Sequence, residues 1–312
     1  MTNASLVTIG ILQALLIAAL APLFSGFARV LRAKMHSRHG PPLLQNYYDL
    51  FKLVKRQEIV PAQASLLFRI TPYLSIAAIL LAVTIIPILT VQSPFGWVGD
   101  MILVVYLLVL VRFFTSLAGL GSGSTFGGMA ARRELLISTL IEPLILLVLF
   151  VMALLAGSTN LGVISGAVAT GELPYNATVW LGMIAFAFVV FIEAGKLPFD
   201  LAEAEQELQE GPLTEYSGRG LALMKWGLYM KQLAVVALFV AVFLPFGSMV
   251  DVSPGAFVVA LLLFIIKAAV LYLVAAVVEN GMARVRFIKA PSVTWIAVGI
   301  GLLCFAFYLV RI

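Results

Sequence analysis

The sequence has few charged residues and almost no cysteine. Of its 312 residues, 11% are charged and 62% are hydrophobic, whereas ordinary soluble domains contain about 25% charged and 45–50% apolar residues. A soluble fold cannot cover that much apolar surface, because its outside must be wetted by water. The single cysteine, Cys304, excludes a disulfide scaffold, and by itself it cannot hold an iron–sulfur cluster. The composition therefore predicts a polytopic membrane protein.

Eight apolar stretches are long enough, or nearly so, to cross a bilayer as helices, which takes about 20 mostly apolar residues. They run over residues 6–27, 72–91, 101–120, 135–155, 179–196, 226–246, 255–278 and 293–310. None shows the strict alternation of an outer-membrane barrel strand. We therefore expect an all-α fold with about eight transmembrane helices, in which residues 1–312 form a single transmembrane domain.

Lysine and arginine are concentrated in the connections that follow the first, third, fifth and seventh stretches. Residues 93–100, 157–178 and 247–254 contain none of the 20 basic residues. The positive-inside rule therefore places the basic connections in the cytoplasm and both termini on the outer, periplasmic side. Two of the cytoplasmic loops are long, at residues 31–71 and 197–221. The first has apolar residues at helical spacing and should contain an amphipathic helix, which either lies on the membrane or docks a protein.

Charged residues inside or at the ends of the apolar stretches are candidate functional groups. They are Glu142, Glu193, Lys267 and Glu279. A charge at the bilayer centre costs at least about 2.5–3.5 kcal/mol, so it normally faces the bundle interior and has a partner. These groups either form buried ion pairs that fix helix register or mark a proton or ion pathway. Arg112, in the third stretch, is expected to extend to the cytoplasmic surface.

The second long loop is the most acidic part of the chain. If it is helical from Pro198 onward, the carboxylates of Asp200, Glu203, Glu207 and Glu210 share one face, and Glu205 points away. Clustered carboxylates repel one another and can share protons. A solvated acidic helix that binds a basic partner surface is the alternative, and the sequence leaves both open.

Two motifs resemble the signatures of the NADH dehydrogenase subunit 1 family, the membrane subunit at the heel of respiratory complex I. One is the run Pro-Phe-Asp-Leu-Ala-Glu-Ala-Glu-Gln-Glu-Leu-Gln-Glu-Gly at residues 198–211. The other is Arg38-His-Gly-Pro, followed by Gln45, Asp49 and Lys52. Further matches are Arg133, Glu142-Pro143, Lys267, Arg284 and Arg286. The resemblance covers nearly the whole chain.

Four positions depart from the complex I pattern, namely Pro42, Lys196, Pro212 and Glu279. With these departures the chain looks more like the membrane subunit of energy-converting nickel–iron hydrogenases, especially bacterial formate hydrogenlyase complexes. This resemblance implies a multi-pass heel subunit of the bacterial cell inner membrane. Such a subunit anchors a cytoplasmic hydrogenase module and links its redox step to proton or sodium movement.

The resemblance also implies roles for individual residues and for partners. The implied proton or ion path comprises Glu142, Glu193, Asp200, Glu203, Glu205, Lys267 and Glu279, with Lys267 and the Glu193 region as candidate partners of Glu142. The implied docking residues are Arg38, Asp49, Lys52, Glu207 and Glu210. The expected partners are a nickel–iron large subunit, an iron–sulfur small subunit and antiporter-like membrane subunits, with no nucleic acid. The nickel–iron centre and the iron–sulfur clusters belong to those partners, and this chain is expected to bind no metal or cofactor and to have no catalytic residue.

Three other functions remain open from the sequence. The chain could be a quinone-binding subunit of an NADH:quinone oxidoreductase, a passive membrane anchor or a separate ion transporter. The chain has no internal repeat of the kind common in transporters, which counts against the third function. The subunits that copurify with the chain test the first function, and the effect of neutralising Glu142 tests the second.

The positive-inside pattern makes a direct prediction about topology. Reporters fused after Gly218 and after Lys289 should report the cytoplasm, and a reporter near Val168 should report the outer side, because only the first two follow basic connections. A cytoplasmic signal at Val168 would contradict the eight-span topology.

Overall fold

The computed structural model describes residues 3–96, 98–197, 199–200, 205–250, 253–282 and 290–310. Within these ranges the regular secondary structure is helical, and two isolated backbone bridges, Thr90–Met249 and Asp100–Asn160, join loop segments. The longer helices are α1 (Asn3–Met35), α3 (Leu66–Ile85), α4 (Met101–Gly121), α5 (Thr125–Ala156), α7 (Ala177–Glu193), α9 (Gly218–Phe243), α10 (Pro254–Gly281) and α11 (Ala290–Val310). The shorter ones are α2 (Gln45–Val54), α6 (Leu161–Ala169), α8 (Glu205–Leu208) and the 3-10 turn η1 (Gly211–Leu213). The all-α prediction is confirmed.

The predicted spans correspond one by one to the eight longer helices. Seven of them are long and apolar enough to cross a membrane, and α7 is shorter, with 17 residues. The third helix, α3, ends at Ile85 rather than near residue 91, because Pro87 disfavours helical backbone at the residue before it. The side-chain amide of Gln13, on α1, satisfies backbone carbonyls at this helix end by donating to those of Val83 (2.7 Å) and Ile86 (2.8 Å). The amphipathic helix expected in the first long loop is α2.

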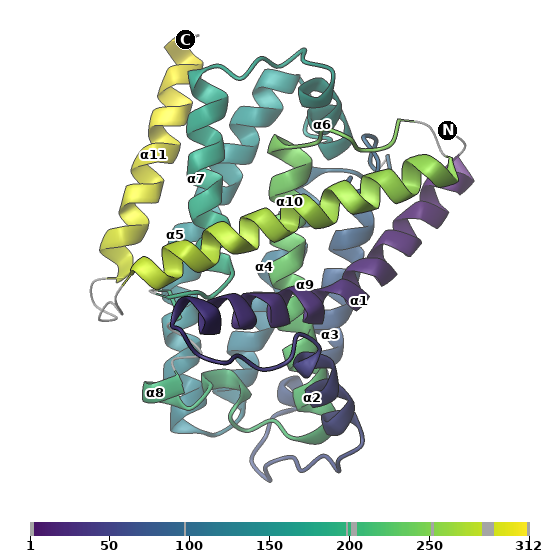
Figure 1. Cartoon of the computed structure of the whole chain (residues 1–312). Helices are drawn as coiled ribbons and strands as arrows, with labels where there is room; N and C mark the ends of the chain where they lie inside the picture. Colours follow the sequence, from purple (N-terminus) through teal and green to yellow (C-terminus); the bar gives the residue numbers. More distant parts are fainter. Residues whose placement is uncertain are drawn as a thin grey trace.

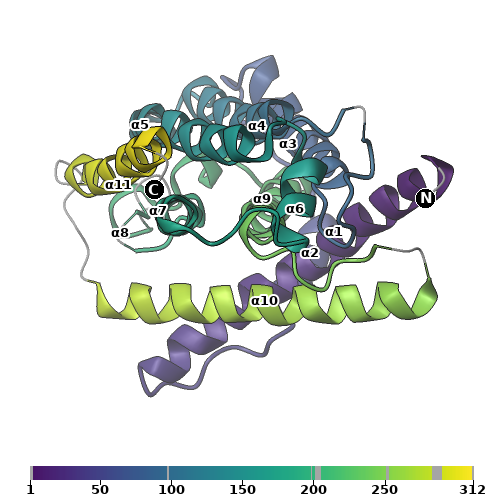
Figure 2. The same ribbon diagram turned by 90° about the horizontal axis from the view of Figure 1, so that it is seen from above.

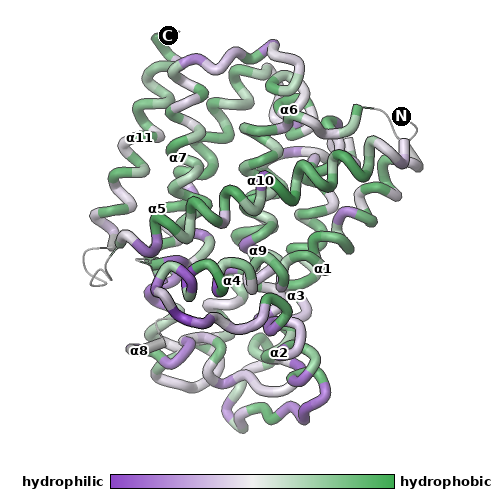
Figure 3. Tube along the Cα trace, in the orientation of Figure 1, coloured by the Kyte–Doolittle hydropathy of each residue, from purple (hydrophilic) through white to green (hydrophobic). Residues whose placement is uncertain are grey.

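The helices form a bundle crossed by two oblique elements. In Figure 1, α4, α5, α7, α9 and α11 run along the bundle, whereas α10 and the second half of α1 cross it. Both termini lie toward the end that carries α6, opposite α2 and α8. Seen from above, α10 lies along one edge, apart from α7 and α11 (Figure 2). We call the end that carries α2 and α8 the basic end; hydrophilic residues are concentrated there (Figure 3).

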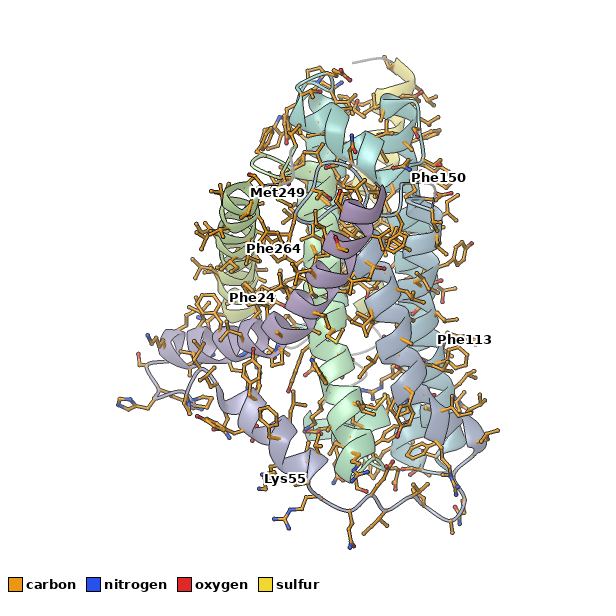
Figure 4. The ribbon with its side chains drawn as sticks, turned by 90° about the vertical axis from the view of Figure 1, so that its right-hand side faces the viewer. Phe24, Lys55, Phe113, Phe150, Met249 and Phe264 are labelled. Carbon is orange, nitrogen blue, oxygen red and sulfur yellow. The ribbon has the colours of Figure 1, made fainter. Side chains whose placement is uncertain are left out.

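Helix α1 changes direction close to Phe24, which is labelled in Figure 4. Pro22 lies inside the helix and has no N–H, so the carbonyl of Ala18 loses its intrahelical donor. The indole Nε1 of Trp226, on α9, donates to that carbonyl at 2.8 Å. A neighbouring helix thus satisfies the backbone group that the proline frees, as a low-dielectric membrane requires.

A side chain also satisfies a carbonyl freed by a proline where α3 meets the acidic loop. Pro72 frees the carbonyl of Phe68, and the hydroxyl of Tyr216 donates to it at 2.7 Å. The ring of Tyr216 stacks on that of Phe68, with 3.9 Å between centroids. Burial, together with the nearby Glu58, raises the pKa of Tyr216, so its hydroxyl keeps its proton and remains a donor. Tyr216 therefore fixes the end of the acidic loop against the bundle.

The described residues do not meet the condition for one acidic helical face, which was a helix continuing from Pro198 through Glu210. Helix α8 covers only Glu205–Leu208, and Asp200 and Glu210 lie outside it. Gln209 and Glu210 have positive φ angles of 50° and 68°, which end the helix. The carboxylates separate because each finds its own cation: Glu207 binds Arg133 of α5 and Glu210 binds Lys225 of α9. Pro198 and Glu203 lie outside the described residues.

The Tyr216 bond predicts a measurable stability difference. Tyr216→Phe removes one hydroxyl and leaves the Phe68 carbonyl without its donor, so we expect a loss of about 1–3 kcal/mol. The readout is the Tm of the detergent-solubilised protein. Tyr48→Phe is the matched control, since Tyr48 is 60% exposed on α2. Equal Tm values for the two variants would contradict the assigned role of the hydroxyl.

Candidate functional site

Four charged side chains meet inside the bundle and form what we call the buried ion cluster: Arg112 of α4, Glu134 of α5, Glu193 at the end of α7 and Lys231 of α9. Arg112 Nε lies 2.5 Å from Glu134 Oε1, and Arg112 Nη1 lies 2.8 Å from Glu193 Oε1. Lys231 Nζ lies 2.9 Å from the other carboxylate oxygen of Glu193. Arg112, Glu193 and Lys231 are more than nine-tenths buried. One ion cluster therefore connects four helices.

The composition of the cluster explains how charge is tolerated at this depth. Two cations and two carboxylates cancel, so the bundle does not bury a net charge there. A charge left alone in a low-dielectric interior is strongly unfavourable, and a partner with good geometry offsets that penalty. The guanidinium of Arg112 lies between the two carboxylates and pairs with both by charge, although its Nε and Nη1 donors are not aligned for hydrogen bonds to them.

The expectation that Arg112 extends to the cytoplasmic surface is wrong. Its side chain is 6% exposed and lies between Glu134 and Glu193. A basic side chain extends to the interface when the bundle offers it no partner. Here two carboxylates converge on the guanidinium from α5 and α7, and they replace the interfacial water.

Glu142 lies near the cluster but outside its ion pairs. It follows Glu134 by eight residues on α5, a rise of about 12 Å along the helix. A cavity of 20 Å³, about the size that one water molecule needs, is lined by Glu142, Arg112 and Glu193. On its other side Glu142 borders a surface groove of 460 Å³ between α4 and α5, beside Tyr106 and Phe113. Phe113 projects from the outside of the bundle in Figure 4. Glu142 therefore connects the interior to the membrane-facing surface.

A larger cavity of 460 Å³ opens near the basic end, and we call it the polar chamber. It is bounded by α1, α2, α9, the end of α10 and the segment after α7. Asp49 and Lys52 of α2 line it. Asp49 accepts a hydrogen bond from Gln45 (2.9 Å) and lies 4.0 Å from Arg29. Glu210 and Lys225 form another ion pair on its wall, at 3.1 Å.

Asp200 and Gln232 connect the polar chamber to the buried ion cluster. Both line the chamber, and both also line a cavity of 70 Å³ whose wall includes Glu134 and Glu193. Three carboxylates therefore follow one another from the chamber inward: Asp200, Glu193 and Glu142. Asp200 and Glu193 line one cavity, and Glu193 and Glu142 line the next. The structure brings these three predicted path residues together.

Glu279 closes one wall of the polar chamber. Its side chain is 5% exposed and pairs with Arg32 of α1. The backbone N–H of Leu197 donates to the same carboxylate at 3.4 Å. Glu279 therefore holds the segment after α7 against α1 and α10.

The remaining predicted residues lie elsewhere. Lys267 donates to the carbonyls of Leu244 (2.7 Å) and Phe246 just beyond the end of α9, where a cation also offsets the helix dipole. Its ammonium is therefore engaged away from the buried ion cluster. Arg38 lies in the exposed turn after α1, and Glu207 pairs with Arg133 at 2.7 Å. Glu205 belongs to α8, but its side chain, like all of Glu203, lies outside the described part.

Two members of the cluster, Glu134 and Lys231, were not among the predicted site residues. Glu134 lies one position before the predicted span of residues 135–155, whereas α5 already begins at Thr125. Lys231 lies inside the predicted span of residues 226–246, but its partner Glu193 is 38 positions away in the chain and on another helix. Among the described residues, no group of three or more His, Cys, Asp or Glu side chains is arranged to hold a metal ion.

Comparisons with known proteins agree over most of the chain. A family model described as NADH dehydrogenase matches residues 7–309. Hydrogenase-4 component C of Escherichia coli (strain K12) is 46% identical over 304 residues, which cover 97% of this chain and 96% of that protein. Formate hydrogenlyase subunit 4 of the same strain is 46% identical over 295 residues, with coverages of 95% and 96%. NADH-quinone oxidoreductase subunit 8 of Thermus thermophilus is 34% identical over 262 residues, with coverages of 78% and 68%.

A solved structure shares the fold. It is that of the membrane-bound sulfane sulfur reductase, an archaeal respiratory membrane complex. One of its chains superposes with a TM-score of 0.81 at 24% sequence identity, and the match covers 95% of this chain and 99% of that chain. The bundle with its oblique helices is therefore an arrangement that a respiratory complex also contains.

The pairing in the cluster predicts a double-mutant result. Arg112→Gln leaves the buried carboxylate of Glu193 and the partly exposed one of Glu134 facing one cation, and should cost roughly 3–5 kcal/mol. Adding Glu193→Gln restores the charge balance, so the double variant should be more stable than Arg112→Gln alone. Thermal unfolding of the solubilised protein measures both, with the exposed Arg132→Gln as control. A double variant less stable than Arg112→Gln would show that the two residues are not coupled as described.

Proposed function

The chain belongs to the NADH dehydrogenase family, and we propose that within it the chain is the heel subunit of a formate hydrogenlyase-type nickel–iron hydrogenase complex. The observation that carries the proposal is the near full-length similarity to two hydrogenase components. The similarity to a complex I subunit is lower and covers less of the chain. In this role the protein anchors a hydrogenase module and links its redox step to proton or sodium movement in the inner membrane.

The basic end offers the surface for that module. The relatives are components of multi-subunit membrane complexes, so partners in the membrane are expected. We assign the nickel–iron large subunit and the iron–sulfur small subunit to the face formed by α2 and the acidic loop. Asp49 and Lys52 lie there on the wall of the polar chamber, and the side chain of Glu207 is 61% exposed. The antiporter-like subunits then lie alongside the bundle. We assign the nickel–iron centre and the iron–sulfur clusters to the partners, because the single cysteine of this chain, Cys304, cannot by itself ligate an iron–sulfur cluster.

The proposed ion path begins in the polar chamber and passes Asp200 and Glu193 to Glu142. Glu193 contacts two cations, which hold it ionised. Glu142 makes no ion pair within 4 Å in the described part of the chain, so it is the carboxylate suited to exchange a proton. A proton on Glu142 changes the local charge by a full unit beside Arg112, where the poorly screened interior makes the change effective. The small cavity between them has room for the water that relays it.

Glu142→Gln tests the path. The glutamine keeps size and hydrogen bonding but removes the titration, and the ion pairs of Arg112 stay intact. We expect a complex that assembles, keeps dye-mediated hydrogen oxidation in detergent and loses any hydrogen-dependent pH change in sealed vesicles. Electrons reach the metal site through partner subunits, which is why the dye activity survives.

The control is Glu172→Gln, because Glu172 is exposed on the connection between α6 and α7. It should acidify vesicles as the unmodified complex does. Intact assembly of Glu142→Gln with unchanged acidification would contradict the path and favour a passive anchor.

Subunit identification tests the wider proposal. After gentle detergent purification, we expect a nickel–iron large subunit among the partners. Recovery of flavin- and NADH-binding subunits instead would assign the chain to an NADH:quinone oxidoreductase and overturn the hydrogenase proposal.

A further inference from the structure

A second large cavity lies next to the polar chamber, and we call it the apolar groove. It measures 450 Å³ and is bounded by α7, α9 and α10. Its lining is mostly apolar, and the lining residues Ile184 and Val274 are 44% and 53% exposed on the outside of the bundle. Helices α7, α9 and α10 correspond to predicted membrane spans, so the groove opens toward the hydrocarbon of the bilayer. The polar chamber, in contrast, is lined by charged groups near the basic end.

A single layer of residues separates the two cavities. Among the described residues, Ala194, Lys196 and Glu279 line both of them. Lipid-soluble molecules dissolve in the hydrocarbon and can reach the groove from the membrane. The charged groups of the chamber, by contrast, are stabilised by water and by one another. The shared wall therefore decides whether the membrane and the polar chamber communicate.

The first part of this wall is a seam between α1 and α10, which cross in Figure 2. Phe24, Ala28 and Arg32 recur every four residues along α1 and share one face. The rings of Phe24 and Tyr272 lie 5.3 Å apart, and Ala28, one turn further along, is buried and lines the groove. After a second turn, Arg32 forms its ion pair with Glu279. The seam is thus closed from the aromatic contact to the ion pair.

The second part of the wall is the segment that follows α7, which bridges α9 and α10. The side-chain amide of Gln232, on α9, donates to the carbonyl of Ala194 at 2.9 Å. The backbone N–H of Leu197 donates to the carboxylate of Glu279, on α10, at 3.4 Å. Glu279 therefore holds both parts of the wall: the seam through Arg32 and the segment after α7 through Leu197.

We propose that the seam and the segment after α7 form a septum, locked by the Arg32–Glu279 pair, that keeps lipid-soluble molecules such as long-chain quinones out of the polar chamber. Glu279 is 5% exposed, whereas the side chain of Arg32 is 44% exposed and lines the chamber. The septum therefore presents a neutralised carboxylate to the membrane and an accessible guanidinium to the chamber. Lys196 and Glu279, two of the four departures from the complex I pattern, both belong to it. The consequence of this exclusion rests on the proposed function, in which the chamber is the start of the ion path.

Thiol labelling from the membrane tests the septum in the intact complex in proteoliposomes. Ser25→Cys places a reporter on the wall of the polar chamber, and N-dodecylmaleimide is a thiol reagent that stays in the membrane. The reporter should react slowly, and adding Glu279→Ala should speed its labelling about tenfold, because the loss of one partner of a buried ion pair opens the wall. The matched control is Glu210→Ala, which breaks the chamber-wall pair with Lys225 away from the groove and should leave the rate unchanged. Peptide mass spectrometry of this chain measures the labelling.

Two further variants make the result independent of any one substitution. Arg32→Ala breaks the pair from α1 and should speed the labelling of Ser25→Cys as Glu279→Ala does. Val274→Cys, in the groove itself, should react fast whether or not the pair is intact. Fast labelling of Ser25→Cys with the pair intact, or equal rates with Glu279→Ala and Glu210→Ala, would overturn the septum. Because these rates do not depend on which redox module is docked, such a result would leave the hydrogenase proposal standing.

Discussion

The ion pairs of Arg112 are the interaction on which the rest of the structure depends. A guanidinium in the interior of an apolar bundle must be neutralised, and Glu134 and Glu193 neutralise it from two other helices. Lys231 balances the second carboxylate and adds α9. The requirement for neutrality therefore fixes how α4, α5, α7 and α9 face one another. Neutralising any one of the four side chains leaves the other three with a net charge inside the bundle.

The same low dielectric governs the backbone. Prolines at positions 22 and 72 free carbonyls that water cannot reach, and the side chains of Trp226 and Tyr216 donate to them. Lys267 binds the carbonyls that follow α9. Most polar side chains that look functional in an apolar sequence thus have structural partners. Among the described carboxylates that line the cavities around the buried ion cluster, Glu142 lies outside the ion pairs, so we assign the proposed proton exchange to it.

The sequence predicted the architecture well because a membrane demands long apolar helices, and the eight stretches show them clearly. Helix ends were harder to place, since Glu134 lies in a helical segment that is more polar than the predicted span of residues 135–155. Lys231 lies within a predicted span, but the sequence did not show that Glu193 is its partner. Pro87 gave a usable signal for the end of α3. The buried position of the Arg112 side chain could not be predicted, because the two carboxylates that pair with it are 22 and 81 positions away in the chain. The ion pairs of the acidic loop could not be predicted from the loop itself, because its cations, Arg133 and Lys225, belong to other helices.

The central claim is that redox events in a docked partner change the protonation of Glu142 through the polar chamber and the buried ion cluster. The most direct measurement is hydrogen-induced infrared difference spectroscopy on the intact complex in membranes. The account predicts a carboxylic acid band in the unmodified complex that is missing from Glu142→Gln and retained in Glu172→Gln. Identical hydrogen-induced spectra for the unmodified complex and Glu142→Gln would contradict it.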